Sequence, residues 1–234
     1  MGLRVYAAHE LAGLHPEAVM LALKGADRRA EIAAQLRPYA LEIILPPLDA
    51  LDIRRAELHL LSEQINSRTV AGSVAELGVY KGDFALELAA CFPNRPLYLF
   101  DTFTGFAEAD LSLEGSNGKA GDFSDTSFEQ VSARFTPYPN VTIIKGHFPE
   151  TALGYEGERF CFVSLDADLY GPVYEGLRFF YPRLSPGGCI LVDDADSSQY
   201  PGAGKALRAF CEEEALFPVP FCDVHGSALL LKPH

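Results

Sequence analysis

The chain has 234 residues, of which 48% are hydrophobic and 22% are charged, and its formal net charge is -13. This composition is ordinary for a globular domain and excludes a disordered chain. Binding along a nucleic-acid backbone needs clustered Lys and Arg, so the acidic balance argues against a nucleic-acid partner.

No segment predicts export or membrane insertion. The first residues lack a basic stretch followed by an unbroken apolar core. The most apolar later stretch, ALEIILPPL, is broken by Pro46 and Pro47. Five cysteines without a CxxC pair favour reduced core thiols over disulfides or a zinc site. We therefore expect a cytoplasmic protein with no membrane span.

Residues 1–70 predict helices that are separated by prolines. Apolar residues recur at helical spacing in residues 16–36 and again in residues 48–66, with a break at Pro38 between them. We expect residues 1–70 to form a helical extension or lid, followed by a second domain over residues 71–234. The apolar surface of these helices also favours a homodimer or a higher homo-oligomer.

From Ser73 onwards, short apolar runs alternate with amphipathic segments, which is typical of a parallel sheet wrapped by helices. The expected strands cover residues 73–79, 96–102, 141–146, 159–167 and 188–194, closed by an antiparallel pair at 219–224 and 227–232. The sequence therefore predicts an α/β fold with a mostly parallel, seven-stranded sheet.

A long connection follows the second predicted strand, over residues 103–131. It is too long for a simple link, and long connections at the carboxyl ends of strands are usually lids or binding loops. Its end predicts a helix with Asp125 or Thr126 as the N-cap and Glu129 in the first turn.

The turn after the first strand of the sheet contains Glu76, Gly78 and Gly82. Glycines at such a turn let a ligand approach the backbone, although the pattern is not GxGxxG and a plain tight turn is an equally open alternative. Asp101 ends the next strand, where an acidic side chain can accept hydrogen bonds from ribose hydroxyls or can simply cap a helix. Together these residues indicate a bound nucleoside cofactor.

Carboxylates follow the next two strands of the sheet. Asp166 and Asp168 end the fourth strand, and Asp193 and Asp194 end the fifth. Neighbouring strands lie about 4.8 Å apart, so these side chains should converge and repel unless protons or a cation compensate. A hard cation such as Mg²⁺ takes carboxylate oxygens. The alternative is that some of these residues cap the following helices.

Six segments resemble, in order and spacing, the macrocin O-methyltransferase family of S-adenosylmethionine enzymes. They are ELGVYKGDF, YLFDTFTGF, GDFSDTSFEQV, KGHFPETA, VSLDADLYGPVYEGLRFFYPRLSPGG and LVDDAD, within roughly residues 70–232. The resemblance implies a Rossmann-like class I methyltransferase fold with a reversed last strand. It also implies S-adenosylmethionine as the methyl donor and a Mg²⁺ ion that chelates the vicinal hydroxyls of a sugar or glycoside acceptor.

The resemblance further implies roles for single residues. The cofactor would contact Glu76, Gly78, Tyr80, Asp101, Thr102, Phe103, Gly146 and His147, with Glu76 and Gly78 at its methionine part, Asp101 at the ribose, and Gly146 and His147 near the adenine. Asp166, Asp193 and Asp194 would ligate the metal. For the reaction itself we expect Asp166 or Asp168 to accept the proton of the acceptor, with a role as metal ligand alone an equally open alternative for Asp166. His147 is equally well interpreted as an ordinary loop histidine. Ala195 stands where relatives often have an aromatic residue.

Two other functions remain open. A nicotinamide-dependent sugar oxidoreductase would share the strand and glycine pattern, but the chain lacks GxGxxG, and Tyr174 is followed by Arg178 where a Tyr-x-x-x-Lys pair needs lysine. A non-catalytic nucleotide-binding module would be expected to lose the carboxylates. His225 could reach the acceptor or could be a turn residue. Leu177, Phe180 and Tyr181 recur at helical spacing and are predicted to pack against the sheet.

Overall fold

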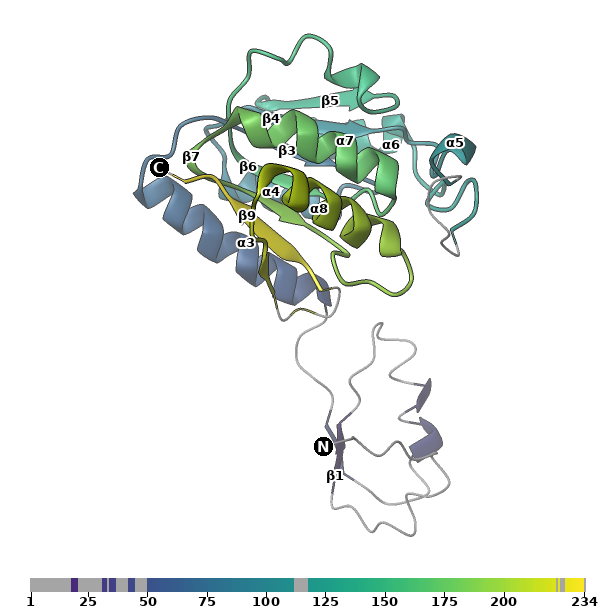
Figure 1. Cartoon of the computed structure of the whole chain (residues 1–234). Helices are drawn as coiled ribbons and strands as arrows, with labels where there is room; N and C mark the ends of the chain where they lie inside the picture. Colours follow the sequence, from purple (N-terminus) through teal and green to yellow (C-terminus); the bar gives the residue numbers. More distant parts are fainter. Residues whose placement is uncertain are drawn as a thin grey trace. The chain divides into compact units, whose positions relative to one another are not determined.

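The structure, a computed structural model, describes residues 18–20, 31–32, 34–36, 42–44, 50–111, 118–221, 223 and 226–233. The chain divides into two compact units, Met1–Arg54 and Arg55–His234 (Figure 1). Within the described ranges, no helix combines the length and the apolar character needed to cross a bilayer.

The first unit departs from the predicted run of helices. Residues 31–32 and 34–36 are helical. However, β1 (Ala18–Met20) and β2 (Glu42–Ile44) are strands that pair in parallel, with Val19 opposite Ile43. The prediction of helix at residues 18–20 was wrong, whereas residues 42–44 lie between the two predicted helices, where no strand was expected either. Both strands contain β-branched residues, which lose side-chain freedom in a helix and favour a pleated strand.

The second predicted helix of the N-terminal region is confirmed as α3 (Ala50–Ser67). Leu58 and Ile65 on this helix are buried, and the guanidinium of Arg55 pairs with the Glu87 carboxylate at 3.0 Å. The apolar positions and this ion pair hold residues 55–67 of α3 in the second unit. The boundary predicted after residue 70 and the role as a lid stay predictions.

The second unit alternates strands and helices as the sequence predicts. Its elements are β3 (Ser73–Leu77), α4 (Asp83–Cys91), β4 (Leu97–Asp101), α5 (Glu108–Leu111), α6 (Phe128–Phe135), β5 (Val141–Lys145), η3 (Glu150–Ala152), β6 (Phe160–Leu165), α7 (Tyr170–Phe180), η4 (Tyr181–Arg183), β7 (Leu184–Val192), α8 (Pro201–Glu214), β8 (Val219–Pro220) and β9 (Ala228–Leu231).

Seven of these strands form one sheet in the order β5-β4-β3-β6-β7-β9-β8. All pairs up to β6 and β7 are parallel, whereas β9 runs antiparallel to both β7 and β8. The mostly parallel sheet with a reversed closing strand is therefore confirmed. From β3 the chain continues to β4 and β5 on one side of β3, and it then returns to β6 on the other side. The order of the strands therefore reverses between β3 and β6. The carboxyl ends of these two strands form the switch point at which such sheets bind ligands.

The core lies between the sheet and its helices. Every residue of β3 and of β6 is buried, because parallel strands are covered on both faces. Figure 1 shows α7 and α8 side by side over one face of the sheet. Leu177, Phe180 and Tyr181 are buried there, as predicted, and the Phe180 ring packs edge to face on Phe160 at 5.1 Å.

The thiols agree with the sequence-based interpretation wherever the structure describes them. Cys161, Cys189 and Cys211 are buried and free, and Cys91 is free and half-buried. Burial raises the pKa of the Cys161 thiol to about 11, which keeps it protonated at neutral pH. Cys222 lies outside the described residues.

Candidate active site

Each of the four central parallel strands is followed by a non-glycine residue with a left-handed backbone. These residues are Tyr80 after β3, Phe103 after β4, Asp168 after β6 and Asp194 after β7, with φ between 51° and 57°. Such backbones cost of order 1–3 kcal/mol each and concentrate at functional sites. The carboxyl edge of the sheet is therefore the candidate active site.

Gly78 brings the ends of β3 and β6 together at the switch point. Its φ is +90°, and a Cβ atom at this position would lie 2.0 Å from the carbonyl oxygen of Asp166. The amide of Gly78 donates to the Phe100 carbonyl at 3.0 Å, and the amide of Asp166 donates to the Leu77 carbonyl at 2.8 Å. Two residues before Gly78, Glu76 is 1% exposed. No side chain larger than hydrogen fits at Gly78 without moving the end of β6.

Asp101 organises the turn that follows β3. Its Oδ2 accepts hydrogen bonds from the amides of Val79 and Tyr80 at 2.7 and 2.9 Å, and its Oδ1 accepts one from the amide of Phe103 at 2.6 Å. These three bonds hold the turns after β3 and β4, and Asp101 is not the N-cap of α4, which is Gly82. Each carboxylate oxygen has further lone-pair capacity, so the contact with a ribose stays a prediction.

The carboxylates after β6 and β7 converge as the strand-end rule predicts. Asp168 is half-buried, and the removal of water from around its carboxyl raises its pKa well above the usual range. The negative charge of Asp166, a hydrogen bond with the Asp194 side chain and the charges of Asp194 and Asp193 raise this pKa further. Asp193 accepts a hydrogen bond from the Ser227 hydroxyl at 2.9 Å. The four carboxylates thus form one interacting cluster.

The predicted Mg²⁺ is not supported by this geometry. Carboxylate oxygens are the donors that Mg²⁺ prefers, so Asp166, Asp193 and Asp194 fit the ion in kind. Within the part of the chain that the structure describes, however, no group of three or more His, Cys, Asp or Glu side chains is arranged to hold a metal ion. These side chains would need additional ligands to bind the ion.

The long connection between β4 and α6 is fastened to the turn after β3. Asp125 accepts hydrogen bonds from the Tyr80 hydroxyl and from the Lys81 ammonium, both at 2.5 Å. The Thr126 hydroxyl donates to the Tyr80 carbonyl at 2.6 Å. The hydrogen bond with Asp125, followed by the one with Tyr80, raises the pKa of Lys81. These bonds hold the connection against the turn after β3.

The N-cap of α6 differs from the prediction. The Ser127 hydroxyl, and neither Asp125 nor Thr126, accepts the hydrogen bond from the Gln130 amide at 3.1 Å. Ser127 has an extended backbone, which an N-cap requires. Glu129 lies in the first turn, as predicted. The two candidate caps are used instead to anchor the connection to Tyr80 and Lys81.

Two residues after β4 have local structural roles. The Thr102 hydroxyl donates to the Gly105 carbonyl at 3.2 Å and accepts from the Thr104 amide at 3.2 Å. Phe103 is 5% exposed, and its ring contacts that of Phe128 at 5.8 Å. Their predicted contacts with the cofactor, and those of Tyr80, stay predictions. His225 lies outside the described residues.

His147 connects the segment after β5 to α5 and to η3. The preceding Gly146 has φ +143° and donates its amide to the Asp101 carbonyl at 2.9 Å. His147 Nε2 lies 2.8 Å from Asp110 of α5, and Nδ1 lies 3.2 Å from Glu150. Partial burial lowers the pKa of His147, but the bonds to Asp110 and Glu150 outweigh it and raise the pKa above the usual value. His147 thus binds α5 to the segment after β5. Its contact with adenine stays a prediction.

Raising the pH is expected to loosen α5. Because the folded pKa of His147 is raised, its pairing stabilises fully below the unfolded pKa of about 6.5 and is lost as the pH rises through the folded pKa. His147 is 40% exposed on its side chain, so solvent weakens the effect. Amide exchange of Asp110 and Leu111, corrected for intrinsic rates, should therefore be faster at about pH 8.5 than at about pH 5.5. In His147→Gln this difference should vanish, and equal protection of the wild type at both pH values would contradict the pairing.

An aromatic cluster beside the carboxylates is absent from the sequence-based prediction. Phe106 and Phe123 of the long connection contact each other at 5.1 Å between ring centroids, and both contact Tyr200 before α8, at 5.6 and 6.0 Å. The signal that could have revealed it is the presence of large aromatic residues inside a Gly- and Asp-rich connection.

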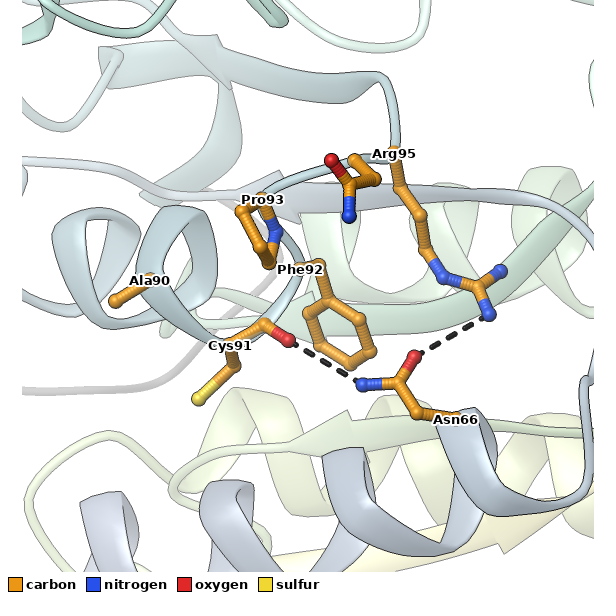
Figure 2. A pocket seen from close by; sticks show the side chains of 7 residues that line it. Asn66, Ala90, Cys91, Phe92, Pro93 and Arg95 are labelled. Carbon is orange, nitrogen blue, oxygen red and sulfur yellow. Dashed lines mark hydrogen bonds between the residues drawn. The ribbon is translucent and has the colours of Figure 1, made fainter.

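The structure also has a pocket of about 360 Å³ at the other edge of the sheet, where α4 ends and β4 begins. Figure 2 shows Asn66 of α3 between the Cys91 carbonyl and the Arg95 guanidinium, with 3.4 Å to each. Arg95 also donates to the carbonyls of Val70 and Gly72, at 2.8 and 2.9 Å. The polar groups of this pocket serve to join α3 to the sheet, away from the carboxylates.

Comparison with known proteins gives a family match. A family model described as Macrocin-O-methyltransferase (TylF) matches residues 51–229 of the chain. A tetracenomycin methyltransferase of Streptomyces olivaceus, 8-demethyl-8-(2,3-dimethoxy-alpha-L-rhamnosyl)-tetracenomycin-C 4'-O-methyltransferase, is 28% identical over 159 residues. That alignment covers 60% of this chain and 59% of the relative.

A second relative, Mycinamicin III 3''-O-methyltransferase of Micromonospora griseorubida, is 32% identical over 143 residues, which cover 53% of this chain and 56% of the relative. The chain thus spans less than 60% of the length of either relative.

Solved structures share the fold. The O-methyltransferase NovP matches with a TM-score of 0.66 and 20% identity, over 77% of this chain and 80% of its own. The calicheamicin methyltransferase CalS11 matches with a TM-score of 0.66 and 20% identity, over 96% of this chain and 89% of its own. At this identity the likeness concerns the fold alone, and it confirms the predicted class I methyltransferase fold.

Proposed function

The chain belongs to the macrocin-O-methyltransferase (TylF) family, and on that premise we propose that it transfers the methyl group of S-adenosylmethionine to a hydroxyl group of a sugar or glycoside. The observation that carries this proposal is the convergence of the Asp101-organised turn and the four carboxylates on one edge of the sheet. The turn would bind the donor, and the carboxylates would receive the acceptor.

The acceptor class is supported by the names of the relatives. One relative is named for a rhamnosyl-bearing tetracenomycin and another for position 3'' of mycinamicin III. Carboxylates suit such acceptors, because they accept hydrogen bonds from hydroxyl groups. The proposal names only the class of acceptor, and the compound that carries the sugar is to be found by screening.

The protein's contribution to the reaction is positioning and removal of a proton. The acceptor oxygen attacks the methyl carbon, a C–O bond forms as the C–S bond breaks, and S-adenosylhomocysteine leaves. The proton passes to the deprotonated carboxylate of Asp166 or Asp168, and we favour Asp168, because its raised pKa makes its carboxylate form a stronger base. The strained backbones at Tyr80, Asp168 and Asp194 fix donor and acceptor sides in place.

Mg²⁺ is the finer part of the proposal. We propose that Asp166, Asp193 and Asp194 take up the ion together with the acceptor, whose hydroxyls would supply the ligands that these side chains lack. When bound, the ion would neutralise the cluster and lower the pKa of a coordinated hydroxyl. The homo-oligomeric state and the cytoplasmic location expected from the sequence also remain predictions.

The test is calorimetric titration of the cofactor-free protein with S-adenosylmethionine and with NADH, each with and without Mg²⁺, followed by methyl-transfer assays on a panel of rhamnosides. Binding of S-adenosylmethionine without NADH binding, and Mg²⁺-dependent methylation that EDTA abolishes, would support both parts. NADH binding would favour the oxidoreductase alternative, and S-adenosylmethionine binding without turnover on any glycoside would favour a non-catalytic module. Turnover that survives EDTA would overturn the metal alone.

A further inference from the structure

Phe123 stands between the donor side and the carboxylate side of the site. Its ring lies edge to face with Tyr80, at 5.4 Å between centroids and 85° between planes, and tilted against Tyr200 at 6.0 Å and 57°. Tyr80 belongs to the turn organised by Asp101. The Phe123 ring therefore bridges the two halves of the edge.

The Tyr200 side of this bridge is tied to the carboxylates through the backbone. The Ser197 amide donates to the Asp194 carbonyl at 3.1 Å, and the Ala203 amide donates to the Asp168 carbonyl at 3.0 Å. Tyr200 lies between these two bonds in the chain. The charges of Asp168 and Asp194 also act on its hydroxyl, whose pKa is raised by burial first and by these charges as well. A ring that contacts Tyr200 is consequently a neighbour of the carboxylate cluster.

Two backbone hydrogen bonds join the two ends of the connection that holds Phe123, residues 105–106 and 121–122. The Phe106 amide donates to the Asp122 carbonyl at 3.0 Å, and the Gly121 amide donates to the Phe106 carbonyl at 3.1 Å. A Cβ atom on Gly105 would lie 2.3 Å from the same Asp122 carbonyl oxygen, so only glycine allows this approach. These backbone contacts fix the position of Phe123 relative to Phe106.

Phe123 differs from its partners in exposure and in backbone. It keeps 38% of its surface exposed, whereas Tyr200 is 9% exposed. Its φ of +64° is a left-handed backbone that a bulky residue rarely adopts. A phenyl ring that is strained and half-exposed beside a carboxylate cluster is poorly explained by packing alone, because glycine would relieve the strain.

We propose that Phe123 is a positioning and specificity-determining residue for the acceptor, and that its exposed ring face packs against the apolar C–H face of a pyranose whose hydroxyl points at the carboxylates. This inference rests on the proposed function. Binding sites commonly combine an aromatic wall with a few polar groups that fix orientation. Here the wall is supplied by the connection that holds Phe123.

The test separates the ring from the strain. Phe123→Gly removes the ring and relieves the backbone, while Phe123→Tyr keeps the ring; Phe217→Ala is the matched control, because Phe217 is 86% exposed and follows the far end of α8. Titrations in the presence of S-adenosylhomocysteine use methyl α-L-rhamnopyranoside and a rhamnosylated aromatic polyketide. We expect Phe123→Gly to weaken rhamnoside binding about tenfold or more, with S-adenosylhomocysteine affinity within about twofold of the wild type. Phe123→Tyr and Phe217→Ala should resemble the wild type.

The outcomes distinguish this inference from the proposed function. Rhamnoside binding that depends on the Phe123 ring, without methyl transfer, would support the acceptor wall and overturn the proposed reaction. Methyl transfer with an acceptor KM that is unchanged in Phe123→Gly would overturn the wall and leave the reaction standing. Absence of rhamnoside binding by the wild type, or a loss in Phe123→Gly matched by Phe217→Ala, would also overturn the wall.

Discussion

Replacing Asp194 by asparagine is expected to lower kcat for methyl transfer by roughly 10²–10⁴-fold, the range that positioned acid–base groups contribute. Asparagine keeps the shape of the side chain but removes the negative charge and one acceptor oxygen. Asp194 is 9% exposed and its side chain is hydrogen-bonded with Asp168, so the change acts at the centre of the carboxylate cluster. Affinity for S-adenosylmethionine should change by less than about twofold, because the donor-side turn depends on Asp101.

The same substitution is expected to stabilise the protein that carries no ligand. Burial first, and then the neighbouring carboxylates, raise the pKa of Asp168, which means that the charged cluster is unfavourable in the folded state. Removing one of its charges should therefore raise the free energy of unfolding by about 0.5–2 kcal/mol, as other substitutions that relieve functional strain do. Urea denaturation checks this part, and steady-state kinetics with the native acceptor checks the other.

Asp196→Asn is the matched control for Asp194→Asn. Asp196 is exposed and lies two residues further along the same turn, where its amide donates to the Gly226 carbonyl at 3.1 Å. Its substitution removes one charge of the same sign and should leave turnover and stability nearly unchanged. Equal loss of turnover in both variants would point to a general effect of charge on the site, and full turnover in Asp194→Asn would remove Asp194 from the mechanism.

The strands of the sheet could be predicted because their burial dictates their composition. Runs such as FCFVSL and CILV, covered on both faces, contain few polar residues and end where the carboxylates begin. The rule that parallel strands end at one edge then placed Asp166, Asp168, Asp193 and Asp194 together. The strands β1 and β2 could not be predicted, because each has only three residues. The segment of β1 also has apolar residues at helical spacing, and β2 lies in the break between the two predicted helices.

Within the site, residue types were easier to predict than hydrogen-bond partners. Asp125 and Thr126 were predicted as the N-cap of α6, but the structure uses the next residue, Ser127, whose backbone is extended and whose side chain accepts from the Gln130 amide. Asp101 accepts hydrogen bonds from three amides that belong to two different connections, one after β3 and one after β4. The aromatic cluster of Phe106, Phe123 and Tyr200 joins positions that are far apart in sequence, and no periodic pattern marks it.

Replacing Asp101 by alanine is expected to weaken S-adenosylmethionine binding by about 100-fold, as calorimetry would measure it. The amides of Val79, Tyr80 and Phe103 lose their acceptor at 2.7, 2.9 and 2.6 Å, and hydrogen bonds to charged groups contribute roughly 1.5–3 kcal/mol each. Tyr80 and Phe103 also hold strained left-handed backbones that these bonds stabilise. The turn should therefore open before any direct contact with the ribose is considered.

Two further variants separate positioning of the turn from direct contact with the cofactor. Asp101→Asn keeps one carbonyl oxygen that can accept from the turn but lacks the charge and the second acceptor, so amide exchange of Val79 and Tyr80 reports whether the turn persists. If protection is kept while affinity falls about 100-fold, Asp101 contacts the cofactor; if affinity falls only as protection falls, Asp101 acts through the turn. Asp83→Ala is the control, because Asp83 is exposed, pairs with Arg134 at 2.7 Å and lies just beyond the same turn. Its affinity should stay within about twofold of the wild type, and wild-type affinity in Asp101→Ala would exclude Asp101 from the donor site altogether.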